Sequence, residues 1–99
     1  MNKCFLVANV VVTDEERYAE YRAKVQGVIA QYGGRYVVRA GAIHPLEGDL
    51  GIKRMIMLEF DSMTAAREFY DSAEYEPLLK LRKETTQSDV AFIEGLSAA

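Results

Sequence analysis

The sequence lacks several features that would assign it to a functional class. Its one cysteine, Cys4, cannot form a disulfide within the chain and lies in an apolar stretch typical of a small buried side chain. No apolar run approaches the ~20 residues of a membrane-spanning helix. The net charge is −3, and no basic cluster of the kind needed to bind phosphates is present. We therefore expect a cytoplasmic protein whose partners are neither membrane nor nucleic acid.

Motifs for common chemistries are also missing from the sequence. It has no CxxC pair, no glycine-rich phosphate loop and no GxSxG motif. His44 is the only histidine, and no HxH or HxxE spacing accompanies it, so we predict no metal and no other cofactor. His44 stays a candidate ligand-binding residue, although a histidine beside Pro45 in a loop is more often a surface residue.

The apolar residues, 49% of the 99, are arranged as alternating strands and helices of one domain. We predict strands over residues 4–12, 35–43, 54–60 and 90–94. A helix begins with Thr13 as N-cap and Glu16 completing a capping box, and ends at Gly33 and Gly34. A second helical region begins at Ser62, breaks or restarts at Pro77 and ends near residue 85. The first helix has one apolar stripe, formed by Tyr18, Tyr21, Val25, Val28, Ile29 and Tyr32.

The β-α-β-β-α-β order predicts an α+β, ferredoxin-like protomer with an antiparallel four-stranded sheet. Two helices can cover only one face of such a sheet, yet residues 5–8 and 55–58 are apolar at both odd and even positions. Both faces are therefore expected to be buried. A second copy packed on the free face would form a dimeric α/β barrel. The alternative is a monomer whose own loops cover that face, but the loops look too short.

Three polar residues, Asn9, Arg39 and Glu59, interrupt apolar strands. If they share a face, Arg39 and Glu59 are expected to pair, because a buried charge needs a partner. Glu59 would then accept a proton or orient a donor, while Asn9 and Arg39 would help to bind a ligand. The alternative is a structural ion pair or a charge in solvent at a strand end.

A second candidate group, Tyr70, Tyr75 and Arg82, lies in the second helical region. Tyrosine combines an apolar ring with a polar hydroxyl, and arginine can hold a carboxylate with two parallel hydrogen bonds. We predict that Arg82, with Glu59, is a candidate catalytic residue and that the two tyrosines line a ligand site. Packing in the core, with the polar ends reaching solvent, is the alternative.

The sequence resembles a bacterial family, the domain of unknown function 1330 (DUF1330), over nearly its whole length. The matching segments are YGGR (32–35), VRAG (38–41), LEG (46–48), LEF (58–60), AAR (65–67), FYDS (69–72), EY (74–75), LR (81–82) and IEG (93–95). The combination is specific, although each segment alone is weak. His44 departs from the family, whose members often have an acidic residue there.

The resemblance implies a ferredoxin-like protomer in the dimeric α/β-barrel superfamily. That superfamily includes cofactor-free monooxygenases, haem-degrading enzymes, isomerases and stress-response proteins, so fold alone does not select a function. We keep three hypotheses. The first is a protein that binds or transforms a small organic, possibly anionic, molecule in each protomer. The second is a structural or regulatory dimer without chemistry, and the third is a monooxygenase-like enzyme or a haem protein with His44 on the iron.

Overall fold

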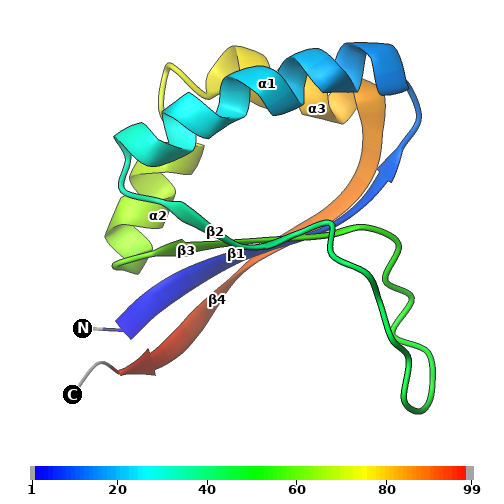
Figure 1. Cartoon of the computed structure of the whole chain (residues 1–99). Helices are drawn as coiled ribbons and strands as arrows, with labels where there is room; N and C mark the ends of the chain where they lie inside the picture. The colour runs from blue at the N-terminus through cyan, green and yellow to red at the C-terminus, as the bar shows by residue number, and fades with distance from the viewer. Residues whose placement is uncertain (1, 98–99) are drawn as a thin grey trace.

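Strands and helices follow the order β-α-β-β-α-α-β in the computed structural model, which describes residues 2–97 (Figure 1). The elements are β1 (Asn2–Val12), α1 (Glu15–Gln31), β2 (Arg35–Arg39), β3 (Met55–Phe60), α2 (Met63–Tyr70), α3 (Glu76–Thr85) and β4 (Thr86–Ser97). The four strands form one sheet in the order β2-β3-β1-β4, and every neighbouring pair is antiparallel. This arrangement confirms the predicted α+β, ferredoxin-like fold. None of the helices in the described region is long and apolar enough to cross a membrane.

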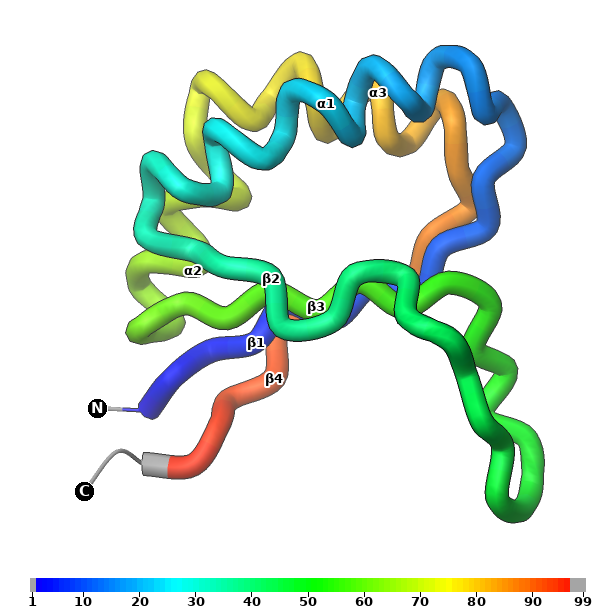
Figure 2. Tube along the Cα trace, in the orientation of Figure 1, coloured from blue at the N-terminus to red at the C-terminus, as the bar shows by residue number. Residues whose placement is uncertain are grey.

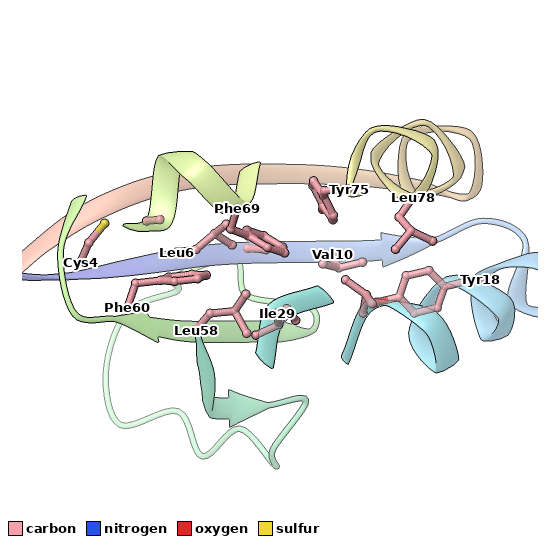
Figure 3. Packing of buried hydrophobic residues seen from close by; sticks show 13 residues of the cluster. Cys4, Leu6, Val10, Tyr18, Ile29, Leu58, Phe60, Phe69, Tyr75 and Leu78 are labelled. Carbon is pink, nitrogen blue, oxygen red and sulfur yellow. The ribbon is translucent and has the colours of Figure 1, made fainter. Parts of the chain in front are cut away.

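All three helices lie on the same face of the sheet (Figure 1). Side chains at even positions of β1 point toward them, and Cys4, Leu6, Ala8 and Val10 are all buried. The solid part of the core lies at one end of β1, where Phe60 and Phe69 pack with ring centroids 5.4 Å apart (Figure 3). The Cys4 thiol is buried there, as expected.

The helix ends follow the sequence signals with one exception. Asp14, and not Thr13, is the N-cap of α1, and its side chain accepts a hydrogen bond from Arg17 N at 3.2 Å. Thr13 precedes the cap, and the backbone N–H groups of Thr13 and Asp14 both donate to Thr85 O, at 2.8 and 3.2 Å. The predicted Ser62 cap of α2 is present and accepts from Ala65 N at 3.1 Å.

β1 and β3 lie within two residues of their predicted bounds, whereas β2 and β4 differ from theirs by several residues. β2 ends at Arg39 because Ala40 adopts a left-handed backbone conformation with φ 54°, which turns the chain out of the sheet. β4 begins at Thr86 and not at Val90. Its first residues are polar, so hydrophobic pattern could not mark them, but they pair in register with the end of β1.

The other face of the sheet, called the open face here, carries the odd-numbered side chains of β1. Phe5 and Val7 are half-buried, while Val11 and Ile93 remain about half exposed, at 43% and 53%. Among residues 2–97, the long loop meets this face at Asn9, but the exposed Val11 and Ile93 show that the chain's own loops leave much of the face uncovered. Residues 40–54 form a long loop that projects on the side away from the helices (Figures 1 and 2).

Candidate functional site

A cavity of about 260 Å³ lies between the sheet and the helices, beside the solid core. Its floor includes one straight cross-strand row, Arg39–Ile56–Ala8–Val90, which crosses the sheet from β2 to β4. Ala8 is the small residue at the centre of that row. The exposed lining residues, Arg22, Arg39 and Ala40, mark the side on which the cavity opens.

Arg82 lies at the deep end of the cavity and is only 7% exposed. Its Nε donates to the Tyr75 hydroxyl at 3.3 Å and its Nη2 to the Tyr70 hydroxyl at 3.4 Å. Burial opposes the charge of Arg82, but the neighbouring Tyr75 and Tyr21 hydroxyls outweigh it and raise the pKa of the guanidinium. Arg82 is therefore a buried cation whose hydrogen-bond partners in the described region are tyrosine hydroxyls and not carboxylates.

The phenols themselves form a connected group. The Tyr21 and Tyr75 hydroxyls lie 2.9 Å apart, and the Tyr70 and Tyr75 rings contact each other with centroids 5.6 Å apart. Burial, followed by the neighbouring Tyr75, raises the pKa of Tyr21 well above its ordinary value. Burial likewise raises the pKa of Tyr36, farther along the wall. Tyr21 and Tyr36 therefore stay neutral near neutral pH and do not compensate the arginine charge.

Three further arginines line the open end of the cavity and are called the mouth arginines here: Arg22, Arg39 and Arg54. Each lies over a tyrosine ring. Arg22 and Arg54 lie over Tyr18, with the guanidinium carbon 5.9 and 5.7 Å from the ring centroid. Arg39 lies over Tyr36 at 4.7 Å. Such cation–π contacts hold the guanidinium in place without neutralising it.

The charges of the cavity are of one sign. It is lined by Arg82 and the three mouth arginines, and by no aspartate or glutamate of the described region. None of the four forms an ion pair with a described residue, whereas Arg17 and Arg35, outside the cavity, pair with Glu84 and Glu59. The arrangement leaves guanidinium donors available for an anion from solution.

A more polar cleft of about 280 Å³ adjoins the deep end. Arg82, Tyr70 and Val90 line both spaces, so Arg82 stands between them. The cleft adds the Lys83 side chain and the Thr86 and Ser88 hydroxyls, which hydrogen bond to each other at 2.7 Å. An anion bound to Arg82 could therefore contact both the apolar cavity and the polar cleft.

The structure brings four of the predicted site residues together: Arg39, Tyr70, Tyr75 and Arg82 all line the cavity. It does not bring in Glu59. The expected Arg39–Glu59 pair is wrong, because a register shift between Tyr36 and Val38 turns Arg39 to the helix-covered face. Glu59 lies on the open face, paired with Arg35 and with Lys3, whose Nζ is 3.5 Å away.

Asn9 and His44 also lie outside the cavity. Asn9 anchors the long loop, since its amide donates to Gly51 O at 2.9 Å and its Oδ1 accepts from Lys53 N at 2.8 Å. His44 is exposed within that loop. Among the described residues, no three histidine, cysteine, aspartate or glutamate side chains are grouped closely enough to hold a metal ion.

Sequence reasoning missed five lining residues that carry polar groups: Tyr18, Tyr21, Arg22, Tyr36 and Arg54. Tyr18 and Tyr21 belong to the apolar stripe of α1, and that position favours packing over a role in a polar site. The available signal was the large number of tyrosines, 6 in 99 residues with no tryptophan. A helix stripe that carries hydroxyls where aliphatic side chains would suffice indicates a polar requirement inside.

Solved structures share this fold at low sequence identity. The RPA0582 protein of unknown function from Rhodopseudomonas palustris is 18% identical, with a TM-score of 0.77 over 97% of this chain and 84% of that one. SnoaB, a cofactor-independent oxygenase from Streptomyces nogalater, is 11% identical, with a TM-score of 0.63 over 99% and 97%. A conserved protein from Methanosarcina mazei Go1 is 13% identical, with a TM-score of 0.58 over 97% and 95%. These likenesses concern the fold.

Sequence comparison gives the more specific result. No curated protein matches the chain. The profile of one family matches residues 3–96, which include every residue that lines the cavity. The chain belongs to the family described as Domain of unknown function (DUF1330).

Proposed function

We propose that the protein binds a small organic anion in the cavity between the sheet and the helices. One observation carries this proposal: four arginines and no carboxylate line the cavity, and none of the four has an ion-pair partner among residues 2–97. The rest of the wall is aliphatic and aromatic, which suits the body of an organic molecule. The bound anion would supply the missing counter-charge.

The energetics of Arg82 support a role in binding. Removing a charge from water is costly unless it is paired, and stability alone is served as well by an apolar side chain of similar size. Arg82 is nearly buried, and its hydrogen-bond partners within residues 2–97 are the Tyr75 and Tyr70 hydroxyls, with no carboxylate among them. A protein that keeps such a cation sacrifices some stability, as binding sites commonly do.

Binding is favoured here over acid–base catalysis. Glu59, the residue expected to accept a proton, lies on the opposite face of the sheet from the cavity. No histidine lines the cavity either. Among the described lining residues, a proton could be exchanged only by phenols, and the raised pKa of Tyr21 keeps its proton in place. The cavity therefore has donors that hold an anion but no ready base.

The proposal is tested by isothermal titration calorimetry with octanoate and benzoate as probes. We expect both to bind, and Arg82→Met to weaken binding at least about tenfold, because a charge-assisted hydrogen bond is lost while packing volume is kept. Lys24→Ala is the matched control, since it also removes one positive charge but lies on the exposed side of α1, paired with Glu20. Equal affinities in Arg82→Met and the parent protein would refute the site. Absence of any acid binding would favour the structural or regulatory alternative.

We further propose that the open face packs against the same face of a second copy. The face is apolar at its centre, where Val7 and Met57 are neighbours in register, and it carries both charge signs at one end, where Glu59 meets Arg35 and Lys3. A patch with both signs can be complementary to itself across a two-fold axis. The exposed loop at 40–54 projects on the same side and would lie beside the second copy (Figure 1).

Sedimentation equilibrium tests this assembly. We expect a dimer, and a monomer for Val7→Lys, because a lysine at the centre of the buried face would be unpaired. Ala23→Lys is the control, since it adds the same charge at an exposed position of α1. A parent protein that remains monomeric at high concentration would refute the dimer without touching the cavity proposal.

A further inference from the structure

We infer that the ligand is an elongated molecule with an anionic group at each end and an apolar middle. This inference rests on the proposed function and names its ligand class. The observation behind it is that the four arginines do not form one cluster. Arg82 lies at the deep end, on α3, while the mouth arginines lie at the opening, on α1 and beside the ends of β2 and β3.

The sheet register gives the scale of the separation. The floor row runs from Arg39 on β2 through Ile56 and Ala8 to Val90 on β4, and Val90 lines both the cavity and the cleft beside Arg82. Three strand spacings of about 4.8 Å separate the row's ends by about 14 Å. Arginine side chains reach inward from both ends, so two anionic groups are expected to lie somewhat closer than that.

The middle of the cavity is apolar along this line. Ile56 and Ala8 form the floor between the two charged ends, with Leu6 and Leu58 in the next cross-strand row. A carboxylate placed over Ala8 would have apolar side chains as its neighbours on the floor and would be poorly solvated. A methylene chain or a ring over Ala8 would instead gain apolar contact. The pattern cation–apolar–cation in the wall therefore matches anion–apolar–anion in the ligand.

The mouth arginines are also held in a way that suits recognition. Each is supported by a tyrosine ring, Tyr18 for Arg22 and Arg54, and Tyr36 for Arg39. A guanidinium held over a ring loses less side-chain freedom when it binds an anion, and it keeps its donors free. The second anionic group would therefore be bound at the opening without rebuilding the site.

The test compares linear dicarboxylates, from succinate to dodecanedioate, with monocarboxylates of equal chain length near neutral pH. Affinity is measured by titration calorimetry on the full chain. We expect an affinity maximum at intermediate length, between adipate and sebacate. At that length the dicarboxylate should bind at least about tenfold more tightly than its monocarboxylate, because it adds a second charge-assisted contact.

Arginine variants test whether the second anionic group binds at the mouth of the cavity. The triple variant Arg22→Ala/Arg39→Ala/Arg54→Ala removes the mouth charges at exposed or half-exposed positions, where folding is at little risk. It should lose the advantage of the dicarboxylate while keeping the affinity for the monocarboxylate. The control, Lys24→Ala/Lys53→Ala/Lys80→Ala, removes the same net charge from exposed positions outside the cavity and should keep the advantage.

Two results separate this inference from the proposal on which it rests. Equal affinity of monocarboxylates and dicarboxylates at every length, with Arg82→Met still weakening both, would overturn the two-ended ligand and leave the anion cavity standing. No binding of any acid, with Arg82→Met indistinguishable from the parent protein, would overturn both. A triple variant that weakens monocarboxylates as strongly as dicarboxylates would also overturn the two-ended ligand.

Discussion

Filling the cavity over Ala8 should raise stability and lower affinity together. Ala8 is 5% exposed and lies at the centre of the cavity floor. Ala8→Val adds two carbon atoms to a space that is already present, on a strand where a β-branched residue is favoured. At about 0.8 kcal/mol for each buried carbon, the free energy of unfolding should rise by up to about 1.6 kcal/mol. The same atoms occupy the room needed by the ligand's apolar middle.

The assay combines urea unfolding with titration of suberate. We expect a higher unfolding midpoint and at least about a tenfold loss of affinity in Ala8→Val. Ala66→Val is the matched control, because Ala66 is 0% exposed in the solid core around Phe69. There the added carbons have no room, so the variant should lose about 1–3 kcal/mol of stability. If Ala8→Val is destabilised like Ala66→Val and still binds suberate, the space above Ala8 is not the binding site.

Three further predictions test the fold, the buried phenol and the open face. Gly34→Ala should lower the free energy of unfolding in urea by about 1–3 kcal/mol, because its Cβ would lie 2.6 Å from the Phe60 ring. The control is Gly27→Ala, which has open space in α1 and should raise the free energy of unfolding by about 1 kcal/mol. Burial raises the pKa of Tyr21 in the folded protein. The stability that this shift contributes is complete below the unfolded pKa of about 10 and is lost as pH rises through the folded pKa. Between about pH 9 and about pH 11, the free energy of unfolding should therefore depend less on pH in Tyr21→Phe than in the parent protein, and equal slopes would refute this. Glu59→Gln should weaken the proposed dimer in sedimentation experiments at low salt while leaving suberate affinity unchanged, and a loss of suberate affinity would contradict its placement on the open face.

Local signals predicted the fold well because the elements depend on local chemistry. Apolar strands, the Ser62 cap and the glycines after α1 each act over a few residues, and the structure retains all of them. The strand ends were harder. The first residues of β4 are polar, and their place in the sheet depends on pairing with β1, which is a contact across the whole chain.

The candidate site was predicted in part, and the wrong pairing of Arg39 with Glu59 has one physical cause. Strand parity puts residues 35, 37 and 39 on one face, which would have placed Arg39 with Glu59. The irregularity between Tyr36 and Val38 adds one residue to β2 and reverses the parity beyond it. Arg35 therefore meets Glu59 on the open face, and Arg39 enters the cavity. A bulge depends on the fit of two strands, and nothing in the residues of β2 alone discloses it.

The net charge of the chain does not indicate an anion-binding cavity. The chain carries 15 acidic and 12 basic residues, and the balance of −3 gives no reason to expect an anion as ligand. The local arrangement is the reverse, because the cavity holds four arginines and no carboxylate of the described region. Positive charges in a cavity with apolar walls attract an anion even when the net charge of the protein is negative.

Added salt should weaken anion binding more at the mouth of the cavity than at Arg82. The mouth arginines are exposed or half-exposed, so added salt screens them over a Debye length of about 10 Å at 0.1 M, whereas Arg82 is buried and largely shielded from salt. Raising the ionic strength should therefore first abolish the advantage of suberate over octanoate, while octanoate affinity changes much less. An equal decline of both affinities would mean that the two acids depend on the same exposed charges, and that Arg82 does not hold the anion common to them.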